Sequence, residues 1–520
     1  MSFLHSVTTI GFYTFASRVL GFIRDMFITS FVGAGAVFDA FIVAFKLPNF
    51  FRRLFAEGAF NAAFVPIFSQ INERDGHEKA FRFATNIFFI MLGFLTLLSL
   101  LFVIGMPIAI KIIAPGFDTT LSRYKMAVDF GRIAFPYILF ISLSALLSGV
   151  LNALHRFTAA AFAPILLNIA MIGMLIVSYF VDTAVGMLLV YGVAIAGILQ
   201  LGFLIIAASR AGFKLHLRLP HLDEKTKILW RKMVPGVVSA GVIQINMFIG
   251  LMVSSLLPAG NISYCSIADR VYQLPLSVIG VAMGTALLPL FSKKVHQNDW
   301  DGIRSTCRRS VEFSLFLSVP SAVALMVIGG PILSVLFQRN AFTAQDVAIT
   351  NKVLFAFATG LPAFVMSKIF SAGFFAASDT KTPMKYAIIT VIINSILNVV
   401  LVLSIGISGI GWSTSIASWI NIFLLGYSLS QLKFIEFRKI ITRFLPRLLM
   451  SSALMAAVLY YASQRYAIHF EQGEFHRAIA LFLLIIVGSL VYLIPSFSLG
   501  VTTIKKLRRS HKPKKIRTKA

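Results

Sequence analysis

The chain has 520 residues, of which 58% are hydrophobic and only 13% charged, too little polar surface for a water-soluble protein of this length. Its formal net charge of +27 is divided among separate loops, so a nucleic-acid-binding surface is not the simplest explanation. The apolar residues instead form runs of about 18 or more, the length that crosses a bilayer as a helix. We therefore predict an all-α polytopic membrane protein.

Fourteen membrane spans are predicted in chain order, near residues 7–31, 37–68, 82–113, 125–152, 159–181, 185–210, 228–257, 264–292, 310–338, 348–377, 384–405, 410–431, 447–463 and 478–500. The first span carries arginines and no small-residue cleavage site follows it, so we expect it to be retained. Of the 47 Lys and Arg residues, 32 lie in one alternate set of loops and the C-terminal segment, and 5 lie in the other. By the positive-inside rule, both termini are expected to be cytoplasmic.

The first two predicted spans carry charged residues at positions where lipid-facing side chains would be apolar. These residues are Arg18, Arg24, Asp25, Asp39, Lys46, Arg52, Arg53 and Glu57. Five are cations and three are anions, so pairing among them leaves two positive charges. A charge that faces lipid costs ~2.5–3.5 kcal/mol on insertion scales, so we favour a water-filled cationic cavity over a purely structural network. Pro48 is expected to interrupt the second helix and allow a kink or hinge.

The eighth span adds the sequence ADRVYQLP, in which Asp269 and Arg270 balance each other and Pro275 is a second helix breaker. Several guanidinium groups in a low-dielectric chamber suit a phosphate or pyrophosphate, which arginine binds through two parallel hydrogen bonds. The pattern therefore predicts a binding site for a polyanionic head group.

Two similar landmarks suggest an internal repeat. PIFSQINERDG begins at residue 66 and PLFSKKVHQNDWDG at residue 289, while Asn168 stands opposite Asn394 at nearly the same offset. Chance matches in a Phe-rich chain are the alternative. A repeat of six spans predicts two parallel lobes with a site between them. The expected divisions are an N-terminal lobe at 1–215, a C-terminal lobe at 216–435, two extra spans within 436–503 and a basic cytoplasmic tail at 504–520.

The motifs for energy-coupled or hydrolytic chemistry are missing from the sequence. It contains no GxxxxGK[ST] phosphate-binding loop and no HExxH metal motif. We therefore expect a transporter without a cofactor, driven by the membrane potential or a monovalent cation gradient. An enzyme acting on a polyprenyl phosphate would need an acid/base or metal cluster. A scaffold would not require cations in mid-membrane, and an exporter of cationic drugs would present unpaired carboxylates.

The motifs SRVLGFIRD, DAFIVAFKLPNFFRRLFAEGAFNAAFVPIFS and ADRVYQLP closely resemble those of the MurJ (MviN) lipid II flippase family. The resemblance runs over nearly the whole chain and places it in the multidrug/oligosaccharidyl-lipid/polysaccharide exporter superfamily. It implies that the protein flips lipid II from the cytoplasmic to the periplasmic leaflet of the bacterial inner membrane by alternating access. It also implies that the last two spans form a groove for the lipid tail. The alternative is a flippase for another polyprenyl-pyrophosphate-linked oligosaccharide.

The resemblance also implies roles for particular residues. The expected substrate-binding residues are Arg18, Arg24, Arg52, Arg270, Lys46 and Arg53. The expected supporting residues are Asp25, Asp39, Asn49, Glu57, Asp269 and Gln273. Gln273 stands where many relatives carry an acidic residue, which makes the local charge more positive. Some relatives bind sodium at positions matching Asn246, Asn394, Asn398 and Thr414.

These four neutral side chains make only a weak cation site, and interhelical hydrogen bonds are the alternative role for the two asparagines of the eleventh span. Besides lipid II, the expected partners are anionic membrane lipids, attracted by the tail KKLRRSHKPKKIRTKA. No nucleic acid partner is expected. The protein is expected to be a monomer, with cell-wall synthesis proteins as candidate partners.

Overall fold

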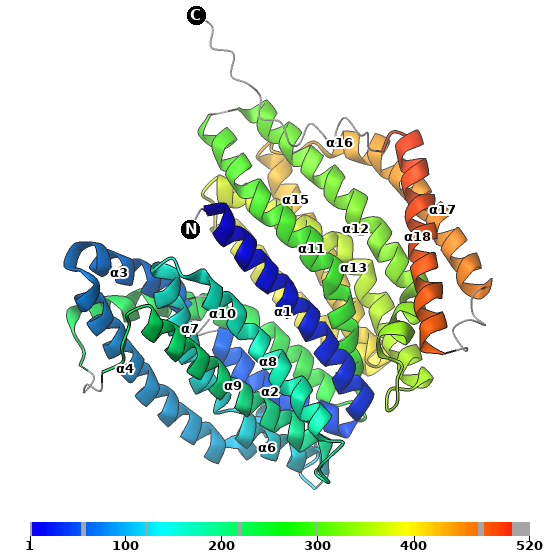
Figure 1. The fold of residues 1–520 in the computed structure, drawn as a ribbon. Coiled ribbons are helices and arrows are strands. Elements are labelled where there is room, and N and C mark those ends of the chain that lie inside the picture. The colour runs from blue at the N-terminus through cyan, green and yellow to red at the C-terminus, as the bar shows by residue number, and fades with distance from the viewer. Residues whose placement is uncertain are drawn as a thin grey trace, which may run out of the picture. The chain divides into compact units, whose positions relative to one another are not determined.

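A computed structural model describes residues 3–53, 59–120, 122–216, 221–297, 299–465 and 473–501 (Figure 1). The described residues form helices joined by short turns, with no strand among them, which confirms the all-α prediction. By their contacts the residues divide into two compact units, one of Met1–Ser263 with Arg339–Thr343 and one of Tyr264–Gln338 with Ala344–Ala520. Glu57 and the predicted tail at 504–520 lie outside the described residues.

The helices of the first unit follow the first seven predicted spans. They are α1 (Phe3–Val32), α2 (Ala36–Arg52), α3 (Ala59–Asp75), α4 (His77–Ile104), α5 (Met106–Ile113), α6 (Ser122–Ala134), α7 (Tyr137–Ala153), α8 (Phe157–Val177), α9 (Val185–Arg210) and α10 (Glu224–Ser255). Three predicted spans are each divided between two successive helices. Pro136 lies between α6 and α7, and Gly105 lies between α4 and α5, so residues that disfavour a continuous helix stand at these breaks.

The second unit contains the remaining predicted spans. Its elements are α11 (Asn261–His296), whose first turn belongs to the first unit, α12 (Trp300–Phe337), α13 (Ala344–Ala376), α14 (Lys381–Ile405), α15 (Ser408–Gln431), α16 (Phe437–Lys439), the π-helical turn η2 (Ile440–Phe444), α17 (Leu445–Arg465) and α18 (Glu474–Ser498). Phe370, Leu425, Leu448 and Leu484 belong to one buried core, so α17 and α18 pack on the same core as α13 and α15. The Tyr492 hydroxyl of α18 donates to the carbonyl of Phe316 on α12 at 2.6 Å.

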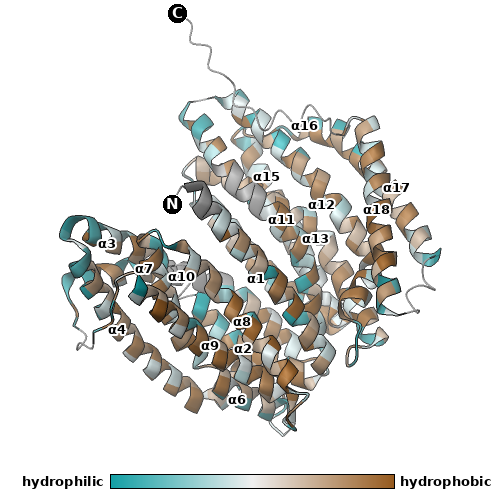
Figure 2. Ribbon diagram, in the orientation of Figure 1, coloured by the Kyte–Doolittle hydropathy of each residue, from teal (hydrophilic) through white to brown (hydrophobic). Residues whose placement is uncertain are grey.

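Nine helical segments within the described residues are long and apolar enough to cross a membrane. Figure 2 shows apolar residues along the length of α4 and α18, while polar residues gather on α3. The long helices α1, α10, α11 and α15 fall outside these nine, and α1 and α11 carry the charged residues that the sequence places within spans.

Two prolines do not act as predicted. The helix α2 continues through Pro48 and ends at Arg52, and α11 continues through Pro275. Proline removes one backbone donor, but the other helical hydrogen bonds persist, and membrane helices tolerate the loss where neighbouring groups satisfy the freed carbonyl. The expected interruption at Pro48 is therefore wrong, and helix α2 ends one turn later.

The helix α10 groups with the first unit because it packs on α3 and α5. Its start is fixed by polar contacts: the Asp223 side chain accepts from the backbone N–H of Thr226, and Lys225 Nζ lies 2.8 Å from Asp75 Oδ2 at the end of α3. The hydrogen bond and the charge of Lys225 lower the pKa of the Asp75 carboxyl from its ordinary 3.8. The lobe boundary at 215–216, which separates α9 from α10, stays a prediction.

Candidate functional site

Arg24 of α1 is held in place by side chains on both sides. Its Nη2 lies 2.6 Å from Asp25 Oδ1, and its Nη1 donates to Asn168 Oδ1 of α8 at 3.2 Å. Asn168 Nδ2 in turn donates to the carbonyl of Ser17 at 3.1 Å, so the same amide braces α8 against α1. The Arg24 and Asp25 side chains are only 16% and 21% exposed. Arg24 is therefore a positioned cation with a fixed orientation.

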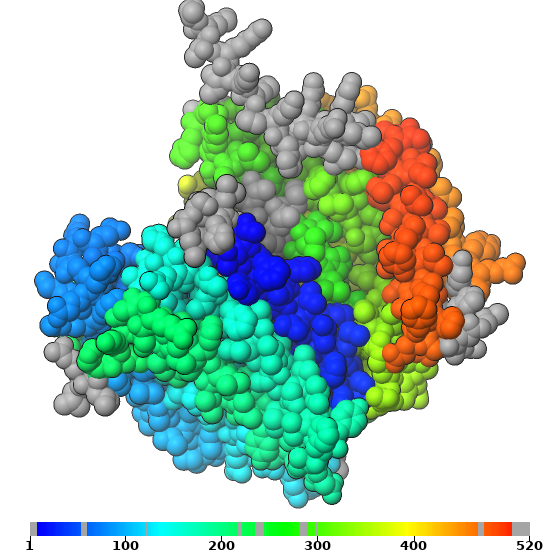
Figure 3. Space-filling model, viewed as in Figure 1, coloured from blue at the N-terminus to red at the C-terminus, as the bar shows by residue number. Residues whose placement is uncertain are grey.

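Arg18 lies six residues earlier on α1, in a different environment. Its side chain is exposed and has no hydrogen bond or ion pair with any residue that the structure describes. It lines an open groove of about 600 Å³ formed by α1, α7 and α8. Thr14 and Ser17 of α1 and Ser148 and Asn152 of α7 line the same groove. Figure 3 shows part of α1, in blue, exposed on the face of the molecule that is drawn. This groove offers a cation and several neutral polar groups to a ligand.

The predicted residues near the end of α2 form local contacts. Arg52 Nε donates to Asn49 Oδ1 at 3.1 Å, one turn back on the same helix. Arg53 is exposed, with its Nη1 3.3 Å from the sulfur of Met247 on α10. Lys46 is half-buried. Asn49 therefore orients Arg52, while its supporting role toward a substrate stays a prediction.

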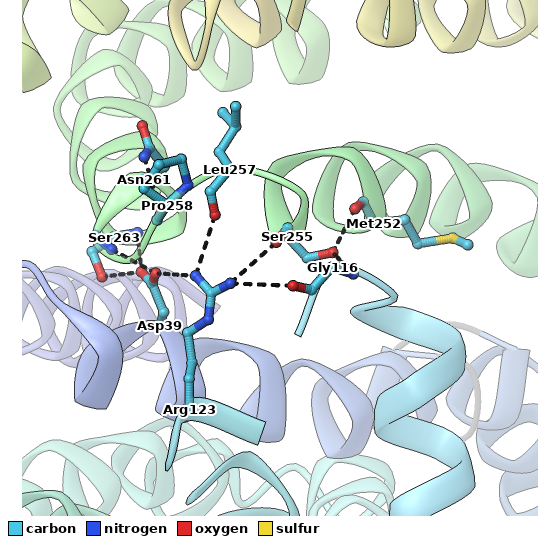
Figure 4. Close-up of polar contacts among 10 residues, drawn as sticks. Asp39, Gly116, Arg123, Met252, Ser255, Leu257, Pro258, Asn261 and Ser263 are labelled. Carbon is cyan, nitrogen blue, oxygen red and sulfur yellow. Dashed lines mark hydrogen bonds and ion pairs between the residues drawn. The ribbon is translucent and has the colours of Figure 1, made fainter. Parts of the chain in front are cut away.

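Asp39 lies in a buried polar cluster near the start of α2 (Figure 4). Its side chain is fully buried and accepts hydrogen bonds from the backbone N–H of Gly260 at 2.7 Å and of Ser263 at 2.9 Å. The Ser263 hydroxyl donates to it at 2.6 Å, and Arg123 Nη1 lies 3.7 Å away. Asp39 thus fixes the first turn of α11 to α2.

Arg123, which sequence reasoning did not select, is the cationic partner in this cluster. Its guanidinium donates to the carbonyls of Leu257 at 3.3 Å, Ser255 at 3.3 Å and Gly116 at 3.4 Å, and it lies 4.1 Å from the centre of the Phe117 ring. A Cβ atom at Gly116 would stand 2.3 Å from the carbonyl oxygen of Ser255, so only glycine permits this approach. The one sequence signal was that Arg123 is among the five basic residues of the sparsely charged loops.

The predicted residues of α11 lie in the second unit. The Gln273 side-chain amide donates to the carboxylate of Asp269, one turn earlier. Asp269 and Arg270 are half-buried. The convergence of Arg270 with the arginines of the first unit stays a prediction.

The predicted weak cation site is divided between the two units. Asn246 belongs to the first unit, while Asn394, Asn398 and Thr414 belong to the second. The Asn398 amide oxygen accepts from the Ser413 hydroxyl, and Thr414 Oγ1 donates to the carbonyl of Ile410 at 2.7 Å. The Asn398 contact is the interhelical hydrogen bond given as the alternative. Among the described residues, no three His, Cys, Asp or Glu side chains are grouped to hold a metal.

Sequence comparison identifies close relatives along the whole chain. The sequence model of the family described as "Lipid II flippase MurJ" matches residues 28–481. A protein of Rhizobium meliloti (strain 1021) named "Probable lipid II flippase MurJ" is 38% identical over 519 residues, with 98% of this chain and 97% of that protein covered. A protein of the same name from Rickettsia prowazekii (strain Madrid E) is 36% identical over 461 residues, covering 88% and 90%.

Structural comparison agrees. A solved structure described as "Lipid II flippase MurJ, inward closed conformation" has a TM-score of 0.76 and 28% identity, with 94% of this chain and 97% of that chain covered. An inward-facing "multidrug resistance MATE family transporter of the MOP superfamily" has a TM-score of 0.68 at 13% identity, covering 80% and 95%, and shows the fold alone. Because the family model spans most of its length and the relatives match nearly all of it, the chain belongs to the lipid II flippase MurJ family.

Proposed function

We propose that this protein is a transporter that flips lipid II from the cytoplasmic to the periplasmic leaflet of the bacterial inner membrane. Membership of the family is the observation that carries the proposal, because it is supported along the whole chain. The charged residues of α1 provide physical support. Arg24 is held in a fixed orientation by Asp25 and Asn168, whereas Arg18 has no partner among the described residues and could turn toward a pyrophosphate without giving up a contact there.

The proposed binding site combines Arg18, Arg24 and Arg52 with Arg270. Lys46 and Arg53 would add positive charge, while Asn49 keeps the Arg52 guanidinium oriented. A fixed cation binds without the entropy cost of ordering a long side chain, whereas a free one can follow a moving ligand. Alternating access between two lobes would then expose the site to one leaflet at a time.

The proposed topology places both termini and the loop at 209–232 in the cytoplasm. It rests on the distribution of 32 basic residues in one set of loops against 5 in the other. The polyprenyl tail would remain in lipid beside α17 and α18, whose outer faces expose apolar side chains such as Leu449, Met450, Phe482 and Ile494. Their opposite faces are buried in the core of the second unit.

The proposed energy source is the membrane potential or a monovalent cation gradient. Moving one charge through 100 mV is worth about 2.3 kcal/mol, so a site with excess arginine would respond to the potential. We propose a monomer that also contacts anionic lipids and cell-wall synthesis proteins.

The test is lipid II flipping in proteoliposomes made with the purified protein. Arg18→Ala is expected to abolish flipping while leaving the elution volume and thermal stability unchanged, and Arg18→Lys to restore it only in part, because lysine lacks the two-pronged geometry. Arg156→Ala is the matched control, since Arg156 is exposed in the turn between α7 and α8 and does not line the groove. Normal flipping by Arg18→Ala would contradict the proposed binding site. Flipping of a different polyprenyl-pyrophosphate glycan, but not lipid II, would contradict the substrate.

A further inference from the structure

The groove formed by α1, α7 and α8 presents two rows of polar side chains. Thr14, Ser17 and Arg18 occur at spacings of three and four on α1, and Ser148 and Asn152 are four apart on α7. These spacings place each set on one face of its helix. Two helices therefore direct polar groups into the same space.

The polar groups of this groove are available to a ligand. The side chains of Thr14, Arg18, Ser148 and Asn152 form no hydrogen bond or ion pair with any described residue. Elsewhere in the chain, helical hydroxyls such as that of Ser254 donate to the carbonyl one turn earlier. The position of α1 beside the groove is nevertheless fixed, because Asn168 of α8 donates a hydrogen bond to the carbonyl of Ser17 on α1.

The residues of α8 that line the groove are apolar. Phe157, Ala160, Ala161 and Pro164 line it at helical spacing. Pro164 has no backbone N–H, so α8 supplies no donor from that position to the carbonyl of Ala160. The α8 side of the groove thus combines small apolar side chains, one aromatic ring and a backbone carbonyl that Pro164 leaves without its helical donor.

This combination suits a sugar attached to a phosphate better than a phosphate alone. Arg18 is the one cation among the described residues that line the groove and can take one phosphate charge, while the polar groups beside it are neutral donors and acceptors. The groove is open, with about 600 Å³ of space along the three helices, so it has room for a ligand larger than a phosphate. A sugar ring offers hydroxyl and amide groups to Ser148 and Asn152 and an apolar face to α8.

We propose that the α1/α7/α8 groove binds the sugar next to the diphosphate of the substrate, with Arg18 contacting the adjacent phosphate and Ser148 and Asn152 selecting the sugar. This inference rests on the proposed function and deepens it. Ser148 and Asn152 are then specificity-determining residues that contribute no charge to the site.

The experiment compares the binding of two lipids to the purified full chain in detergent, by native mass spectrometry or thermophoresis. Lipid II carries the sugar, and undecaprenyl pyrophosphate does not. The double variant Ser148→Ala/Asn152→Ala is expected to weaken lipid II binding about tenfold, as the loss of two hydrogen bonds predicts, and to leave undecaprenyl pyrophosphate within about twofold. Arg18→Gln should weaken both lipids. Ala161→Phe, which fills the groove, should weaken lipid II more than undecaprenyl pyrophosphate.

Ser144→Ala is the matched control, because Ser144 lies one turn earlier on α7, is buried and does not line the groove. Equal weakening of both lipids by the double variant would overturn the assignment to the sugar. No change in either lipid, while Arg18→Gln weakens both, would overturn the role of the groove and leave the proposed function standing. Failure of the wild-type protein to bind or flip lipid II would overturn the proposed function itself.

Discussion

Replacing Asp39 by alanine tests whether the buried cluster stabilises the first unit. The carboxylate is fully buried and accepts three hydrogen bonds of 2.6–2.9 Å, two of them from the backbone N–H groups of Gly260 and Ser263. Alanine would leave those two donors without their acceptor and Arg123 without its counter-charge. Removing one partner of a buried pair typically costs ~3–5 kcal/mol. The three carbonyls that Arg123 also contacts moderate the loss, so we expect a decrease of about 3 kcal/mol in the free energy of unfolding.

A second variant separates the contributions within the cluster. Ser263→Ala removes the hydroxyl but retains the backbone N–H that donates to Asp39 at 2.9 Å. Its expected cost is therefore about 1.5 kcal/mol, the value of one hydrogen bond to a charged group. Asp182→Ala is the control, because Asp182 is exposed in the turn after α8, where a substitution should change stability by less than about 0.5 kcal/mol.

Equilibrium unfolding in mixed micelles, followed by the fluorescence of the four tryptophans, measures these differences. The expected order of destabilisation is Asp39→Ala, then Ser263→Ala, then Asp182→Ala. If Asp39→Ala and Asp182→Ala unfold with the same free energy, the cluster does not stabilise the fold and the reasoning from burial fails.

Three further predictions concern other contacts. Gly116→Ala should lower the melting temperature more than Gly93→Ala does. A Cβ atom at residue 116 would lie 2.3 Å from the Ser255 carbonyl oxygen, whereas a Cβ atom at residue 93 would meet nothing within 4 Å. Equal melting temperatures of the two variants would refute this. The pKa of Asp75 is lowered in the folded state, so the contact between α3 and α10 should stabilise the fold above pH 3.8 and weaken as the pH falls through the lowered value. Faster hydrogen exchange at the start of α10 at low pH should show this loss. Lys225→Gln should abolish the pH dependence, because the partner of the carboxylate is then uncharged. Asn168→Ala should slow flipping, because Arg24 and the Ser17 carbonyl both lose their hydrogen-bond partner on α8. Asn72→Ala, outside this contact, is the control and should leave the flipping rate unchanged. An unchanged rate in both variants would show that the contact with α8 does not position Arg24 for flipping.

The sequence was sufficient to locate the helices because their signal is local. Each predicted span coincides with one helix or with two successive helices, since runs of apolar residues determine which segments can enter a membrane. The exact breaks depend on details that hydropathy does not contain. Pro48 was expected to interrupt the second span, yet α2 continues through it to Arg52.

Pairing between charges was harder to predict because it depends on contacts between distant residues. Asp39 and Arg123 are separated by several helices in sequence, and the sequence grouped Asp39 with the other charged residues of the first two spans instead. Asn168 emerged from the repeat as a landmark, but nothing in the sequence placed it against Arg24. Helical periodicity indicates which residues share a face, whereas the identity of the facing helix requires the fold.

The contrast between Arg18 and Arg24 bears on how a flippase can both capture and release its substrate. The two residues are about 9 Å apart along α1, at 1.5 Å per residue. Arg24 is held by Asp25 and Asn168, so its charge is partly neutralised and its orientation is fixed. Arg18 is exposed and must lose rotamer freedom when it binds, which lowers its net contribution to affinity. A site built only of fixed, unpaired arginines would bind a pyrophosphate too tightly to let it go. In the proposed site, one fixed cation with a paired charge and one exposed cation would recognise the head group and still allow its release.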